Sequence, residues 1–141
     1  MNKHFLNLRE YGSTEVRDLV HGALELKKGS HQKNLNGKYL ALIFEKSSTR
    51  TRLSFEVAMN QLGGRASFLS VSDLHLGRGE PISDTAKVIS SMADGIVLRT
   101  LKHSTLEKFA ASSGVPIING LTDLSHPCQL LADMLTFVEH K

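Results

Sequence analysis

Apolar residues along this chain follow two alternating patterns. Short continuous apolar runs are typical of buried strands, whereas apolar residues spaced three and four apart are typical of helices with one buried face. The sequence predicts buried strands over residues 39–44, 66–70, 96–99 and 115–118. It predicts helices over residues 13–26, 51–62, 83–92, 104–111 and 127–138.

Strands and helices alternate from residue 39 onwards. This order is typical of right-handed crossovers between parallel strands, so we expect an α/β fold. The predicted architecture is a four-stranded parallel sheet with helices on both faces, a doubly wound, Rossmann-like arrangement of three layers. No internal repeat or Pro-rich linker divides the sequence, and we expect residues 1–141 to form one domain. Such sheets bind ligands at the carboxyl ends of their strands.

The composition is that of a globular domain. Of the 141 residues, 40% are hydrophobic and 22% are charged, which is enough apolar material for a sizeable core. No apolar run reaches the roughly 18 residues that span a bilayer, and the N-terminus lacks a signal-type stretch. Cys128 is the one cysteine, so no internal disulfide and no cysteine-based metal site are expected. These features predict a cytoplasmic protein that does not bind membranes.

The charge distribution favours a small anion over nucleic acid as a ligand. The net charge is +3, but Lys and Arg are scattered along the chain rather than concentrated, and 6% of residues are aromatic. Nucleic-acid interfaces usually gather basic side chains on one face and add aromatic platforms for bases. We therefore expect no nucleic-acid partner.

The segment after the first predicted strand is rich in hydroxyl and guanidinium groups. Residues 47–52 read Ser-Ser-Thr-Arg-Thr-Arg and lead directly into a predicted helix. Ser and Thr are favoured at a helix N-cap, and the first turn presents unpaired amides that attract anions. Arg50 and Arg52 would add charged donors to phosphate oxygens. The alternative is an ordinary capped helix with two solvated arginines, and this pattern by itself does not separate the two interpretations.

Two further strand ends carry polar groups. Arg99 ends the third predicted strand, where it is either a ligand contact or a surface arginine whose stem packs along the sheet. The fourth strand leads to His126-Pro127-Cys128-Gln129. Proline at the first helical position predicts that His126 caps the last helix and that Gln129 lies in its first turn. Three strand ends would thus offer donors to one crevice.

Other chemistries receive little support from the sequence. Cys128 and His126 diverge at a helix start and lack a third orienting group, which argues against a thiol nucleophile. Residues 77–79, Gly-Arg-Gly, are too short and isolated for a dinucleotide fingerprint. No carboxylate pair for acid and base work is evident among Glu45, Glu56 and Asp84. Five histidines are interpreted as surface residues: His4, His21, His31, His103 and His140.

Two separated motifs resemble the signatures of the aspartate and ornithine carbamoyltransferase family. They are residues 48–56, STRTRLSFE, and residues 126–133, HPCQLLAD. The intervening segments 73–86 and 94–99 are more similar to the ornithine branch than to the aspartate branch. The resemblance covers nearly the whole chain, and two spaced motifs with a matching middle segment are more specific than any single short pattern.

The resemblance implies roles for individual residues. The phosphate of carbamoyl phosphate would be held by Ser48, Thr49, Arg50 and Thr51. Arg99 and His126 would hold the carbamoyl oxygen and act as the catalytic residues, and Gln129 would bind the carbamoyl amino group. Pro127 and Cys128 would belong to the same ligand-binding turn.

His75 is a departure from the family pattern. It lies where many family members carry glutamine, on a loop that in the family reaches into the site of a neighbouring subunit. Histidine can donate the same hydrogen bond. We therefore keep His75 as a candidate contact to carbamoyl phosphate.

The resemblance also implies an activity for the complete enzyme. It predicts transfer of a carbamoyl group to L-ornithine, which yields L-citrulline and phosphate in arginine biosynthesis, by a homotrimer that needs no metal or cofactor. In the family a second domain binds the amine, and we expect these 141 residues to lack it and to show little or no turnover alone. The alternatives are a carbamoyltransferase for aspartate or another amine, and a noncatalytic phosphate-binding module.

Overall fold

A computed structural model of the chain describes residues 4–29, 34–72, 74 and 79–141. Its strands form one parallel sheet in the order β2-β1-β3-β4, so the predicted fold class is confirmed. The strands are β1 (Tyr39–Phe44), β2 (Arg65–Ser70), β3 (Gly95–Arg99) and β4 (Ile117–Leu121).

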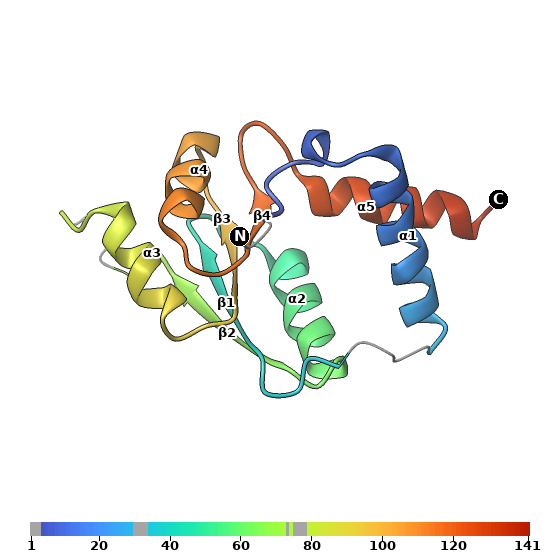
Figure 1. Cartoon of the computed structure of the whole chain (residues 1–141), viewed down its shortest axis with the longest axis horizontal. Helices are drawn as coiled ribbons and strands as arrows, with labels where there is room; N and C mark the ends of the chain where they lie inside the picture. Colours follow the sequence, from blue (N-terminus) through green and yellow to red (C-terminus); the bar gives the residue numbers. More distant parts are fainter. Residues whose placement is uncertain (1–3, 30–33, 73, 75–78) are drawn as a thin grey trace.

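Helices cover both faces of this sheet. The structure has a short 3₁₀ helix η1 (Leu8–Glu10) and the α-helices α1 (Ser13–Lys27), α2 (Thr49–Gln61), α3 (Ile82–Ser90), α4 (His103–Ser112) and α5 (Pro127–Glu139). Helices α3 and α4 lie on one face and α2 on the other, while α1 and α5 lie together beyond α2 (Figure 1). None of the helices within the described ranges is long and apolar enough to cross a membrane.

The sheet separates two hydrophobic cores. Alternate side chains of β1 point to opposite faces. Ile43 joins the core under α3 and α4, where Phe109 is buried, and Leu42 joins the core under α2, where Met59 is buried. A central strand covered on both faces must be apolar at every position, which explains why residues 39–44 read as one continuous apolar run.

The chain changes direction across the sheet between β1 and β3. From β1 it runs out to β2 at one edge, and it then returns to β3 on the other side of β1. In doubly wound sheets this switch point opens a crevice outside the carboxyl ends of the two central strands. The residues that follow β1 and β3 therefore lie where a ligand is expected.

The bounds of β4 differ from the sequence prediction. Residues 115–118 were expected, but β4 spans Ile117–Leu121 and includes the polar Asn119. Asn119 is fully buried because its side-chain amide is satisfied: Nδ2 donates to the Leu6 carbonyl at 2.8 Å, and Oδ1 accepts from the Leu121 amide at 2.9 Å. The sequence pattern could not show these partners, and a polar residue therefore looked like the end of the strand.

The N-terminal segment covers the outer edge of β4. The Phe5 amide donates to the Ile117 carbonyl at 2.7 Å, and the Asn119 amide donates to the Phe5 carbonyl at 2.8 Å. Phe5 thereby forms a parallel bridge with Ile118. Pairing of this kind protects a sheet edge that would otherwise present free backbone groups. The sequence patterns did not indicate this contact.

Candidate functional site

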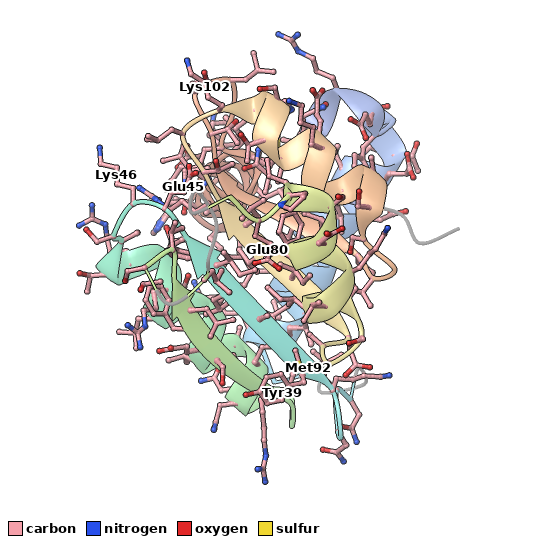
Figure 2. The ribbon with its side chains drawn as sticks, turned by 90° about the vertical axis from the view of Figure 1, so that its left-hand side faces the viewer. Tyr39, Glu45, Lys46, Glu80, Met92 and Lys102 are labelled. Carbon is pink, nitrogen blue, oxygen red and sulfur yellow. The ribbon has the colours of Figure 1, made fainter. Side chains whose placement is uncertain are left out.

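Charged side chains gather at the carboxyl end of the sheet. Glu45 and Lys46 follow β1, and Lys102 follows β3. Figure 2 shows these three residues at one end of the molecule and Tyr39 and Met92 at the opposite end. The sequence motifs singled out above also follow β1, β3 and β4, so the site is built on the edge that the topology favours.

The start of α2 combines a cap with a place for an anion. Ser48 is the N-cap, with φ −156° and ψ 113°, and its Oγ accepts a hydrogen bond from the Thr51 amide at 3.3 Å. The amides of Thr49 and Arg50 lie in the first turn, where a helix offers them no carbonyl partner. No acidic residue occupies this first turn. Exposed Arg50 adds a full positive charge to the helix dipole.

The two arginines of the motif have different surroundings. The Arg52 Nε donates to Glu56 Oε1 at 3.0 Å, and its guanidinium carbon lies 3.9 Å from the centre of the Phe68 ring. Arg52 is exposed, and these two contacts hold it against its own helix and β2. Of the two arginines, we therefore expect Arg50 to make the direct contact with an anion.

Arg99 ends β3 with a half-buried side chain. Its Nε is buried without a hydrogen-bond partner in the described part of the chain. Burial lowers the pKa of the guanidinium, which nevertheless stays protonated at neutral pH. A buried donor without a protein partner is rare, and such a group calls for an explanation such as a catalytic role. The half-buried Arg99 is therefore a candidate for a ligand contact.

His126 caps α5, as the sequence predicted. Its Nδ1 is buried and has no hydrogen-bond partner among the residues described. Burial lowers its pKa, the positive charge of Arg99 acts in the same direction, and Asp133 opposes them. The imidazole is therefore neutral at pH 7. Arg99 is thus near enough to His126 to act on it electrostatically.

The other side chains of the α5 motif differ in exposure. Gln129 is exposed, and its Nε2 donates to Asp133 Oδ1 at 2.9 Å. The Pro127 side chain is fully buried. The Cys128 thiol donates to the Asn119 carbonyl at 3.6 Å, and burial raises its pKa to about 11. The thiol is thus protonated at neutral pH and unsuited to nucleophilic attack, in agreement with the sequence interpretation.

The site residues do not share one closed cavity. Ser48 and Thr49 line a hollow of about 420 Å³ beside Phe68. His126 and Gln129 line another of about 360 Å³ beside the N-terminal segment. In the sheet, β3, which ends at Arg99, lies between β1 and β4. His75 is outside the described residues.

Glu45 lies at the same edge of the sheet and has a structural contact that the sequence did not predict. Its Oε2 accepts hydrogen bonds from Thr100 Oγ1 at 2.5 Å and from the Leu101 amide at 2.7 Å. This carboxylate ties the end of β1 to the turn after Arg99. Its position directly after the first buried strand is the feature of the sequence that could have indicated this contact. The absence of a second carboxylate near Glu45 in sequence gave no indication of such a role.

Two histidines differ from their predicted surface placement. His103 is only 8% exposed, and its Nδ1 lies 2.8 Å from Thr122 Oγ1. His4 is half-buried, and its Nδ1 accepts from the Ile117 amide at 3.1 Å. The interpretation as surface residues is wrong for both, because each ring finds a polar partner that is remote in sequence. His21 and His140 are exposed as predicted.

A family comparison agrees with this geometry. The sequence model described as the carbamoyl-P binding domain of aspartate/ornithine carbamoyltransferase matches residues 3–139. The chain belongs to the aspartate/ornithine carbamoyltransferase family.

Curated members of this family show the same relationship. The chain is 60% identical to an ornithine carbamoyltransferase of Hydrogenovibrio crunogenus, and the match covers 99% of this chain and 47% of that protein. It is 55% identical to the protein named ornithine carbamoyltransferase 1, anabolic, of Pseudomonas savastanoi pv. phaseolicola, with the same coverage. The chain therefore spans about half the length of the carbamoyltransferases it matches.

Solved carbamoyltransferase structures share the fold closely. The anabolic ornithine carbamoyltransferase of Campylobacter jejuni superimposes with a TM-score of 0.93 at 52% identity, over 97% of this chain and 45% of that one. The ornithine carbamoyltransferase of Pyrococcus furiosus gives a TM-score of 0.90 at 44% identity, over 99% and 46% of the two chains. The backbone that carries the motifs is thus shared with these two enzymes.

Proposed function

We propose that this chain binds carbamoyl phosphate at the carboxyl edge of its sheet and supplies the carbamoyl-phosphate half of an ornithine carbamoyltransferase active site. The observation that carries the proposal is the pair of buried nitrogens, Arg99 Nε and His126 Nδ1, which lack protein partners in the described chain. They lie at the same edge as the helix start at Ser48. Membership of the carbamoyltransferase family supports this choice of ligand.

The start of α2 is suited to the phosphate end of the ligand. Phosphate is a dianion that accepts several hydrogen bonds, and the first turn of α2 offers amides, hydroxyls and the Arg50 guanidinium. We assign phosphate binding to Ser48, Thr49, Arg50 and Thr51. The charge that phosphate acquires as it leaves is then stabilised where it forms.

Arg99 and His126 are suited to the carbonyl end. When an amine attacks the carbonyl carbon, negative charge grows on the carbonyl oxygen. Fixed donors that point at such an oxygen lower the barrier, and removal of one costs roughly 3–4 kcal/mol in comparable sites. Neutral His126 can donate an N–H, and charged Arg99 adds an electrostatic contribution. Gln129, in the first turn of α5, would bind the carbamoyl amino group.

Ornithine is the amine that the relatives favour. The compared relatives are named ornithine carbamoyltransferases, and two of them are named anabolic. We therefore propose the reaction of carbamoyl phosphate with L-ornithine to give L-citrulline and phosphate, in arginine biosynthesis. A homotrimeric enzyme and a cytoplasmic location stay predictions from the family resemblance and from the composition, as does a contact from His75.

Binding calorimetry tests the proposal directly. Carbamoyl phosphate, a stable phosphonate analogue of it and inorganic phosphate are titrated into the 141-residue chain. We expect the first two to bind more tightly than phosphate, because only they reach Arg99 and His126 from the start of α2. Equal affinities for all three would indicate the noncatalytic phosphate-binding module instead.

A matched pair of arginine variants locates the site. Arg50→Ala removes a charge-assisted hydrogen bond and should weaken carbamoyl-phosphate binding by about 1.5–3 kcal/mol. Arg65→Ala removes an exposed arginine at the amino end of β2 and should leave the affinity unchanged. If both variants bind like the original chain, Arg50 is not part of the site.

A turnover assay tests whether this chain alone catalyses the proposed reaction. With carbamoyl phosphate and ornithine together, we expect the 141-residue chain to form little or no citrulline, since the family resemblance implies that a second domain binds the amine. Citrulline is measured by a colorimetric ureido assay. Rapid formation would show that these residues suffice for catalysis.

A further inference from the structure

We propose that His103 is a positioning residue that holds the turn carrying His126 through the Thr122 hydroxyl. The inference deepens the proposed function, on which it rests, because it concerns how a carbonyl-binding group is placed. His103 lies at the first position of α4, close behind Arg99 in sequence, and the motifs did not include it.

Backbone hydrogen bonds join the turn after β3 to the turn after β4. The Thr100 amide donates to the Leu121 carbonyl at 3.1 Å, and the Asp123 amide donates to the Leu101 carbonyl at 3.0 Å. The His103 amide in turn donates to Asp123 Oδ1 at 2.9 Å. The turn that follows Arg99 and the turn that precedes His126 therefore each donate hydrogen bonds to the other.

The His103 ring adds a buried side-chain contact to this connection. The ring is 8% exposed and Thr122 is 7% exposed. Their atoms Nδ1 and Oγ1 are 2.8 Å apart, which is a good hydrogen-bond distance. The other hydrogen bonds of the Thr122 hydroxyl are made within its own turn, so the His103 ring is the contact that ties this hydroxyl to α4.

Thr122 in turn organises the residues before His126. Its Oγ1 accepts from the Leu124 amide at 3.3 Å and from the Ser125 amide at 3.4 Å. Its own amide donates to the Ser125 carbonyl at 3.1 Å. These bonds close a compact turn, and His126 is the next residue. Its backbone position follows from this turn, since no side-chain hydrogen bond caps α5.

Asn119 supports the same turn from the strand side. Its Nδ2 lies 3.3 Å from both the carbonyl oxygen and the Oγ of Ser125. The turn is thus held from β4 by Asn119 and from α4 by His103. His103 adds a side-chain contact to the backbone bonds that join this turn to the Arg99 side, and together they fix the separation of the two carbonyl-binding groups. Displacement of about 1 Å at such groups can cost on the order of a hundredfold in rate.

Paired variants of both partners test the proposal. His103→Leu and Thr122→Val remove the hydrogen bond, whereas His103→Asn keeps a polar atom near the Nδ1 position and Thr122→Ser keeps the hydroxyl. We expect the first two to weaken carbamoyl-phosphate binding by about three- to tenfold, as for loss of one neutral hydrogen bond. The two conservative variants should restore most of the affinity.

The titration of His126, followed by NMR on histidine-labelled protein, supplies a second readout that needs no ligand. His126→Gln assigns the signal. If the turn loosens in Thr122→Val, His126 gains solvent and its midpoint should rise, while Thr122→Ser should titrate like the original chain. This readout stays valid if the original chain fails to bind carbamoyl phosphate, a result that would refute the proposed function alone.

Two results overturn the positioning role. One is an unchanged affinity and an unchanged His126 midpoint in folded His103→Leu or Thr122→Val. In the other, His103→Leu and Thr122→Val both fail to fold, and a folded Thr122→Ala variant binds carbamoyl phosphate and titrates like the original chain. That result would leave His103 with a purely structural role.

Discussion

At the scale of single residues, the site concentrates buried polar atoms that the protein itself does not satisfy. Among the described residues, Arg99 and His126 each bury one such nitrogen, and the Thr85 hydroxyl in α3 is a third such atom, whereas the fully buried Asn119 amide has protein partners. Partial desolvation of the charged Arg99 guanidinium costs stability, and its charge disfavours protonation of His126. A ligand that accepts hydrogen bonds and carries negative charge would relieve this cost.

His126 should titrate below its usual pKa of 6.5. Burial is the main cause, and Arg99 adds to it, so Arg99→Gln should raise the midpoint only part of the way back. Histidine NMR in each variant measures this, with Arg65→Gln as the control that should change nothing. A midpoint at or above 6.5 in the original chain would contradict the burial of His126.

The same group links stability to pH. The unfolded chain binds a proton near pH 6.5, while folded His126 binds it only at lower pH. Between these two values the unfolded state holds more protons, so the contribution of His126 to stability is present above pH 6.5 and is lost as the pH falls. Urea denaturation at several pH values should show less of this loss in His126→Gln.

Gly120 keeps β4 close to Arg99. A Cβ at this position would lie 3.1 Å from Val97 Cγ1 and 3.4 Å from Arg99 Cβ. Gly120→Ala should therefore lower the free energy of unfolding by about 1–3 kcal/mol, because the Val97 side chain in β3 must shift.

Gly22→Ala is the matched control for this change. Gly22 lies within α1, and a Cβ there would meet no atom within 4 Å. This variant should gain roughly 0.5–1 kcal/mol, as expected for Gly to Ala inside a helix. Denaturant melts measure both. Equal stability changes in the two variants would show that Gly120 is not sterically constrained.

At the scale of elements, the start of α2 serves both the stability of the helix and the binding of an anion. The start of α2 needs a cap for its own stability, and it also presents the amides and positive dipole end that an anion requires. Ser48 serves the first purpose through its contact to the Thr51 amide and stays neutral for the second. Substitution of Ser48 can separate the effect on helix stability from the effect on anion binding.

Ser48→Ala and Ser48→Asp should have opposite patterns. Alanine removes the cap and should cost about 0.5–2 kcal/mol of unfolding free energy. Aspartate is an equally good cap and should retain stability, but its charge should abolish phosphate and carbamoyl-phosphate binding by repulsion. Thermal melts and calorimetry provide the two measurements. Strong ligand binding by a stable Ser48→Asp variant would place the anion elsewhere.

At the scale of the whole molecule, burial is concentrated around the sheet. The layers formed with α2, α3 and α4 contain nearly all buried apolar residues described, whereas α1 and α5 each bury a single residue, Val20 and Pro127. Helices α1 and α5 pack on each other, with an ion pair of 2.7 Å between Lys27 and Glu139 (Figure 1). Stability should therefore depend on the sheet layers far more than on this helix pair.

Two phenylalanine variants test this contrast. Phe109 in α4 is 1% exposed, and Phe109→Ala should cost about 3–5 kcal/mol of unfolding free energy through the cavity it creates. Phe137 in α5 is 61% exposed, and Phe137→Ala should change stability by less than about 0.5 kcal/mol. Chemical denaturation with matched m-values measures both. A large loss in Phe137→Ala would mean that the helix pair is part of the cooperative core.

The order of elements and the position of the site could be read from the sequence. Apolar runs predicted each strand, and three- and four-residue spacing predicted all five α-helices to within three residues at each end, because both signals are local. The caps of α2 and α5 were readable for the same reason, since Ser48 and Pro127 act on neighbouring amides. A site at the carboxyl edge followed from the parallel order.

Contacts between distant residues could not be read in this way. The extension of β4 through Asn119, the Glu45 bond to Leu101 and the buried His103–Thr122 pair each depend on partners that only folding brings together. A polar residue alone in sequence looks solvated, and burial becomes favourable only when a remote partner satisfies it. The sequence by itself thus determined the elements and the chemistry at their ends, and the tertiary structure decided which polar groups are buried, which are satisfied, and which remain for a ligand.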